Sequence, residues 1–217
     1  MRKNLLKIIL ALFPLIFLSL TSCIGLSIDI QARENGSARV ALEYRVLSST
    51  EAIGRLDGNA NWPMVPTGRG DWERTIARIP GASLASFASR QKQNDIVTNV
   101  TLEFENTDAM LKFLDPDGNR AFFSDNRFSV ILNKSVSRRI NQDLLALFNQ
   151  ASGDYEFAIS LTVDGKTCAM TVTNGEGKEI SPPESARVVQ PGRKASLSVP
   201  IAEIISHEDG LGVKFSW

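Results

Sequence analysis

Hydrophobic and polar residues alternate along two neighbouring stretches near the start of the chain. The first covers residues 27–32, the second covers residues 38–47, and Asn35-Gly36 lies between them. Alternation of this kind is the pattern of a strand with one buried face. Asn and Gly tolerate the positive φ angles of a tight turn. The pattern therefore predicts a β-hairpin formed by these two stretches.

Similar alternating or short apolar stretches predict further strands, most of them in the last third of the chain. Residues 95–105 alternate over their whole length, and residues 120–124 and 127–133 predict a second hairpin. The strands expected in the last third are residues 155–163, 168–173, 186–189, 195–199 and 212–217. We expect Asp164-Gly165 and Asn174-Gly175 to form hairpin turns between them.

Helical spacing of apolar residues, together with capping side chains, predicts five short helices. They are residues 50–56, 71–79, 83–91, 107–114 and 138–150. Asp71 is expected to cap the second helix, and Asn106-Thr107 is expected to cap the helix that ends at Leu114.

The order of these elements indicates the fold class. Strand pairs, then helices, then strands are typical of an α+β fold, in which an antiparallel sheet built from hairpins carries several short helices on one face. The C-terminal part is strand-rich. We expect a single α+β domain over residues 23–217, with a soft subdivision near residues 150–154.

Residues 57–72 predict a long loop, because Gly, Pro and Asn occur throughout it. This loop contains four large apolar side chains, those of Trp62, Met64, Val65 and Trp72. Loops of this length are uncommon in compact domains and are often functional. Two interpretations stay open: the four side chains fold back over the edge of the core, or they form a lid or a contact surface for a lipid or a protein partner.

The chain begins with the three parts of an export signal. A short basic head is followed by an apolar run over residues 5–20 and then by small residues. The end of this segment, Leu20-Thr21-Ser22-Cys23, resembles the lipobox of bacterial lipoproteins. In that family the Cys thiol receives a diacylglycerol and the peptide is cut just before the Cys.

The lipobox resemblance implies that residues 1–22 are a signal peptide and that Cys23 carries lipid, with its amino group acylated as well. Each buried CH₂ of an acyl chain contributes about 0.8 kcal/mol, so two or more chains hold a protein firmly at a membrane. The resemblance implies a location at the bacterial cell membrane or the outer membrane, facing the periplasm or the exterior. Ile24 stands where lipoproteins of the inner membrane often have Asp, which favours the outer membrane. An uncleaved membrane anchor over residues 8–26 and ordinary secretion are the alternatives.

The charge and the cysteine content of the chain limit which binding partners and metal sites are possible. The chain has 24 basic and 24 acidic residues, and the leader holds three basic and no acidic ones, so a mature chain of 195 residues has a net charge of −3. No basic face for nucleic acid is present. With Cys23 acylated, Cys168 has no disulfide partner, and a single histidine, His207, argues against most zinc sites. We expect no cofactor.

The layout after Cys23 resembles that of the mycobacterial LppM-type lipoproteins and similar bacterial lipoproteins. The residues that carry this resemblance are the strand–turn–strand unit at 28–46 and the C-terminal strand at 213–217, which ends in Trp. The resemblance implies a membrane-tethered domain whose sheet and helices shelter a lipid-like ligand. It assigns no functional residue.

Three functions are compatible with these observations. The first is a non-enzymatic binding or interaction module for a lipid-like ligand or an envelope protein. The second is an accessory structural subunit of an envelope complex, or a surface antigen. The third is an envelope hydrolase that uses carboxylates in turns, for which the candidates are Asp57, Asp71, Asp115, Asp117, Glu208 and Asp209. The chain has no nucleophile elbow, zinc-binding His-Glu-x-x-His pair or phosphate loop.

Overall fold

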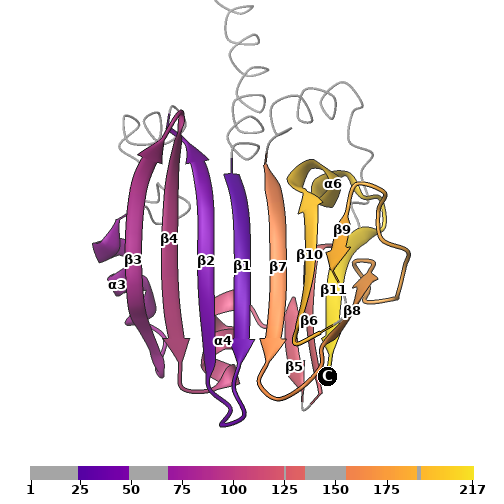
Figure 1. The fold of residues 1–217 in the computed structure, drawn as a ribbon, viewed down its shortest axis with the longest axis horizontal. Coiled ribbons are helices and arrows are strands. Elements are labelled where there is room, and N and C mark those ends of the chain that lie inside the picture. Colours follow the sequence, from indigo (N-terminus) through magenta and orange to yellow (C-terminus); the bar gives the residue numbers. More distant parts are fainter. Residues whose placement is uncertain (1–23, 49–67, 125, 135–154, 190–191) are drawn as a thin grey trace, which may run out of the picture.

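The computed structural model describes residues 24–48, 68–124, 126–134, 155–189 and 192–217. Within these ranges the chain forms two β-sheets and three short helices (Figure 1). The expected combination of strands and short helices is confirmed in part, because strands predominate and two separate sheets are present. The predicted helices at 50–56 and 138–150 lie outside the described residues.

The large sheet has seven strands in the order β3-β4-β2-β1-β7-β10-β9. They are β1 (Ile24–Ala32), β2 (Ala38–Leu47), β3 (Ala82–Lys92), β4 (Asp95–Phe104), β7 (Glu156–Val163), β9 (Arg187–Val189) and β10 (Lys194–Pro200). Neighbouring strands are antiparallel except β1 and β7, which run parallel. The expectation of a purely antiparallel sheet is therefore wrong, because β7 enters the sheet from the same end as β1.

The small sheet has four antiparallel strands in the order β5-β6-β11-β8. They are β5 (Ala121–Ser124), β6 (Arg127–Lys134), β8 (Ala169–Thr173) and β11 (Gly210–Ser216). The C-terminal strand therefore lies in the middle of this sheet, between β6 and β8. Figure 1 shows the small sheet behind the large one.

The two predicted hairpins are confirmed. In the first, β1 pairs with β2 so that Ile30 lies opposite Val40, and the turn contains Gly36 at φ +82°. The amide of Arg33 donates to the carbonyl of Ser37 at 2.9 Å and closes the turn. In the second hairpin β5 pairs with β6.

The two turns predicted near the C-terminus differ in what they connect. Asp164-Gly165 follows β7, but β7 pairs with β1 and β10 rather than with β8, so this turn does not form a hairpin. Asn174-Gly175 does reverse the chain locally, since Thr173 bridges to Glu179. The main partner of β8 is nevertheless β11.

Residues 83–91 form most of strand β3, so the helix predicted there is wrong. A β-bulge between Leu84 and Ser86 inserts one extra residue opposite β4. The bulge puts Leu84 opposite Leu102 and Phe87 opposite Val100, so that side chains three residues apart face the same side of the sheet. Their spacing in the sequence therefore imitates the spacing of a helix.

Three helices lie among the described residues: α3 (Arg69–Ile76), α4 (Thr107–Leu114) and α6 (Ile201–Ser206). The prediction of α4 is confirmed, and the side chain of Asn106 accepts from the amide of Ala109 at 2.8 Å. The predicted cap of α3 is wrong, because the helix begins two residues before Asp71, with Gly68 at the N-cap. Helix α6 was not predicted, since six residues are too short to show a helical period.

Buried side chains from both sheets form one core. Ile30, Leu161 and Leu197 of the large sheet are fully buried, as are Val213 and Phe215 of the small sheet. Both sheets combine strands from before residue 135 with strands from after residue 154, so neither sheet is divided at residues 150–154.

We predict that Gly212→Ala destabilises the protein by about 1–3 kcal/mol, the usual range for overpacking a filled site. A Cβ at this position would lie 2.6 Å from Thr173 Oγ1 and 2.9 Å from the Val130 carbonyl oxygen. Gly192→Ala is the matched control, because a Cβ there meets nothing within 4 Å. Urea unfolding of both variants measures the difference, and equal losses of stability would contradict the packing described for β11.

Candidate functional site

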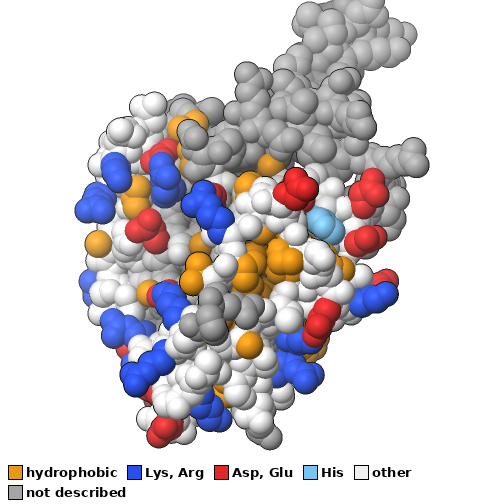
Figure 2. All heavy atoms as spheres, turned by 45° about the vertical axis from the view of Figure 1, so that its right-hand side comes forward, with side chains coloured by type: hydrophobic (Ala, Val, Ile, Leu, Met, Phe, Trp, Pro, Cys, Tyr) orange, Lys and Arg blue, Asp and Glu red, His pale blue; other side chains and the backbone are white. Residues whose placement is uncertain are grey.

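The outer face of the large sheet, which is turned away from the small sheet, is polar and crossed by ion pairs. Lys194 on β10 pairs with Asp29 on β1 at 2.6 Å, and Arg187 on β9 pairs with Glu156 on β7 at 3.1 Å. Figure 2, which views the molecule obliquely from this side, shows charged side chains of both signs together with a group of hydrophobic side chains. Three hollows on the surface differ in how many charged and how many apolar side chains line them.

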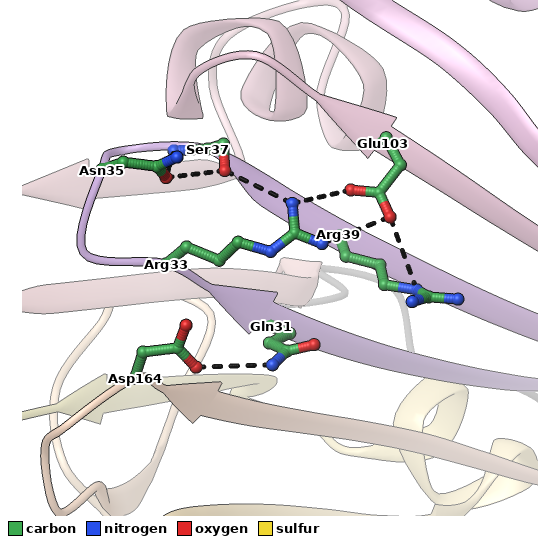
Figure 3. Close-up of polar contacts among 7 residues, drawn as sticks. All are labelled: Gln31, Arg33, Asn35, Ser37, Arg39, Glu103 and Asp164. Carbon is green, nitrogen blue, oxygen red and sulfur yellow. Dashed lines mark hydrogen bonds and ion pairs between the residues drawn. The ribbon is translucent and has the colours of Figure 1, made fainter.

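The first hollow, about 310 Å³, lies at the end of the large sheet that carries the β1–β2 turn. Arg33 pairs with Glu103 at 2.9 Å, and Arg39 approaches the same carboxylate at 3.6 Å (Figure 3). The hydrogen bond to Glu103 raises the pKa of the Arg33 guanidinium. Asn35 accepts from the Ser37 hydroxyl at 2.7 Å and orders the turn. These half-exposed pairs tie the turn to β4 and contribute at most about 1 kcal/mol each.

The second hollow, about 210 Å³, lies at the opposite end of the sheet, where β1 begins. Beside it the carboxylate of Asp95 accepts from Arg45 Nη2 at 2.6 Å and from the Tyr155 hydroxyl at 2.9 Å. The Arg45 guanidinium also stands 5.7 Å from the centre of the Tyr155 ring. A Cβ on Gly25 would lie 3.3 Å from this ring, so the glycine gives Tyr155 room to lie across β1.

The third hollow, about 170 Å³, differs in being mainly apolar. It lies between β8 and β9, the strands that end the small and the large sheet. Its lining residues are Met170, Thr171, Val172, Glu179, Ile180, Pro182 and Val188. Nothing local in the sequence pointed to this hollow, because its walls come from two sheets whose edges only the fold brings together.

The predicted lipidation site and the predicted contact residues of the loop separate into two groups. Cys23, Trp62, Met64 and Val65 lie outside the described residues. Trp72 lies in α3, is 4% exposed, and donates its ring N–H to the Tyr44 hydroxyl at 3.1 Å. Its assignment to a contact surface is thereby corrected: Trp72 is a core residue, held between Tyr44 and Phe113.

Two of the candidate carboxylates, those of Asp71 and Asp115, have structural partners. Asp71 forms an ion pair with Arg74 within α3. Asp115 accepts from the amides of Arg120 and Ala121, and these hydrogen bonds lower the pKa of its carboxyl group. Asp57 lies outside the described residues. No group of three or more His, Cys, Asp or Glu side chains with metal-binding geometry occurs in the described ranges.

Cys168 and His207 are far apart. Cys168 is fully buried and bridges to Gly192, just before β10. His207 follows α6, beyond the other end of β10, so the length of that strand separates the two side chains. Burial raises the pKa of the Cys168 thiol. The two residues therefore do not form a nucleophile–base pair.

No protein-family model matches the chain, and no curated protein is similar to it in sequence. Among the described residues, no helix is both long enough and apolar enough to cross a bilayer.

We predict that the free energy of unfolding falls as the pH rises above about 10, the ordinary pKa of tyrosine. Burial raises the pKa of Tyr44 in the folded protein. Above that pH the unfolded chain loses the phenol proton while the folded protein retains it, so alkaline pH favours unfolding. Urea titrations from pH 8 to pH 11 measure this slope. Tyr44→Phe should make it shallower, and an unchanged slope would contradict the burial of this hydroxyl.

Proposed function

We propose that the protein is a lipid-anchored protein of the bacterial envelope that acts as a non-enzymatic binding module. Its anchor is the acylated Cys23 of the lipobox Leu20-Thr21-Ser22-Cys23. Its ligand is a lipid-like molecule, met at or near the membrane surface. Because Ile24 rather than Asp follows the cysteine, an outer membrane is the favoured location.

The observation that carries this proposal is where the folded body begins. Ile24, the residue after Cys23, is already the first residue of β1 and pairs with Val46 of β2. Two residues further, Leu26 pairs with Phe157 of β7. No spacer therefore separates the lipobox cysteine from the large sheet, so acyl chains on Cys23 would hold this end of the sheet close to the bilayer.

The loop residues Trp62, Met64 and Val65 fit this arrangement. The segment that carries them follows β2, whose last residue, Leu47, lies at the same end of the sheet as Ile24. The amide of Ser48 donates to the Asn94 carbonyl at 2.7 Å and fixes the exit of the chain there. We propose that these apolar side chains contact lipid beside the anchor.

A lipid-like ligand is favoured over a hydrolase substrate by the chemistry of the hollows. The two polar hollows are bordered by arginines and carboxylates that pair with each other, such as Arg33 with Glu103 and Arg45 with Asp95. The third hollow offers apolar side chains at the surface, which is the usual lining of a small-molecule site.

An accessory role in an envelope complex is the second candidate, and strand β3 favours it. β3 ends the large sheet, is eleven residues long, and exposes most of its side chains. A strand at the end of a sheet can pair with an extended segment of another protein. Crosslinking in intact cells through a reactive group placed at Ser86 tests this role: one reproducible protein adduct supports it, and no adduct contradicts it.

The anchor is tested by counting thiols in full-length protein isolated from membranes. The chain has two cysteines, and Cys168 is buried, so the folded protein should show no reactive Cys168 thiol. In urea exactly one thiol should react if Cys23 is acylated. The N-terminal peptide should begin at Cys23 and carry the mass of two or more acyl chains. Cys23→Ser is the control and should retain the leader.

Two reactive thiols in urea, or a leader still attached to the wild-type protein, would contradict the proposed anchor. The Cys168→Ala variant checks the count, because it should show no reactive thiol in urea when Cys23 is acylated.

A further inference from the structure

The apolar hollow between β8 and β9 opens the core of the protein at one side. We propose that this hollow binds the acyl chain of a single-chain anionic amphiphile, such as a fatty acid, with its head group at the β11 side of the opening. The inference rests on the proposed function, because it names the class of lipid-like ligand and the place where it binds.

One wall of the hollow is continuous with the core. Val188 on β9 lies opposite Leu197 on β10, which is fully buried, so Val188 faces the inner side of the large sheet. Met170 and Val172 on β8 are buried and share one face of that strand. Val188 is nevertheless 36% exposed, which makes it one of the few large apolar side chains at the described surface. The hollow thus presents core-like surface to the solvent.

The other side of the hollow is polar and has an unsatisfied hydroxyl group. Thr171 lies between Met170 and Val172 and lines the hollow. Its Oγ1 is buried and has no hydrogen-bond partner in the part of the chain that the structure describes. A buried hydroxyl without a partner destabilises the fold, and the head group of a ligand would supply the missing bond.

The positively charged side chains near Thr171 favour a ligand with an anionic head group. Lys214 lies opposite Thr171 on β11 and forms an ion pair with Glu179. Arg127 pairs in register with Ser216, two residues further along β11, and its charge also lowers the pKa of Glu179. Two cations therefore stand near one carboxylate, and the excess positive charge complements a carboxylate or phosphate head group.

The size of the hollow favours a ligand with a single hydrocarbon chain. Its volume is about 170 Å³. An apolar cavity of about 150 Å³ is enough to hold a molecule the size of benzene. The hollow therefore takes a short length of one hydrocarbon chain, and the two chains of a membrane phospholipid would not fit.

The test uses full-length acylated protein in phosphatidylcholine nanodiscs, titrated with sodium octanoate and followed by saturation-transfer NMR. Empty nanodiscs give the background. Wild-type protein should bind octanoate saturably and prefer it to octylamine. Val188→Asp should weaken binding at least about tenfold, because a carboxylate in the apolar wall is costly to bury and repels the head group.

Val189→Asp is the matched control. Val189 is the next residue, is 61% exposed, and lies opposite Ser196 on the other face of β9, so octanoate binding should stay unchanged. Urea unfolding midpoints check that both variants fold. Lys214→Gln, which leaves the apolar wall intact, should remove the preference for octanoate over octylamine and keeps the test decisive if Val188→Asp fails to fold.

The proposal is overturned if wild-type protein shows no saturable binding, or if Val188→Asp and Val189→Asp weaken it equally. Self-association that Val188→Asp abolishes, without octanoate binding, would assign the hollow to a second copy of the chain and would also overturn it. Acylation of Cys23 is measured on the same preparation. Acylated protein that does not bind octanoate refutes this inference and leaves the proposed anchor standing.

Discussion

The pairing of β1 with two neighbours holds the large sheet together. β1 is antiparallel to β2 on one side and parallel to β7 on the other. Ile30 lies opposite Val40 in one pair and opposite Leu161 in the other, and all three side chains are fully buried. In the described part of the chain, β1 joins strands β2, β4 and β3 on one side of the large sheet to strands β7, β10 and β9 on the other. The core between the two sheets therefore depends on β1, the first strand of the described chain.

The position of β1 determines how the proposed anchor would orient the protein at the bilayer. A strand hydrogen-bonded on both sides from Leu26 onward would form a stiff connection between the proposed anchor and the sheet. The body of the protein would then hold a defined orientation to the bilayer, with the Arg45–Asp95–Tyr155 cluster at the anchored end and the Arg33–Glu103 pair at the far end. The opening between β8 and β9 is where the proposed single-chain lipid would enter.

Alternation along the sequence predicted most strands because the spacing of side chains encodes which face of a strand is buried. It predicted β1, β2 and β4, and the side chain of Asn106 marked the start of α4. It failed at β3, where one bulge puts Leu84 and Phe87 on the same face. It also failed at Trp72, because the Gly, Pro and Asn residues before it indicated a loop, whereas the ring packs against Tyr44.

Contacts that depend on the order of strands in the sheet could not be predicted from the sequence. The parallel pairing of β1 with β7 joins Leu26 to Phe157 across most of the chain, and no turn signal marks it. Alternation did place Arg39 and Glu103 on the polar faces of their strands, yet only the register of β2 with β4 brings them opposite each other. The apolar hollow forms where the edges of the two sheets meet.

Hydrogen exchange of the full-length protein in membranes tests the role of β1 most directly. The amides of residues 26–31 should exchange only through global unfolding, far more slowly than those of the edge strand β9. If the amides of β1 exchanged as fast as those of β9, the central role of β1 in the large sheet would be contradicted.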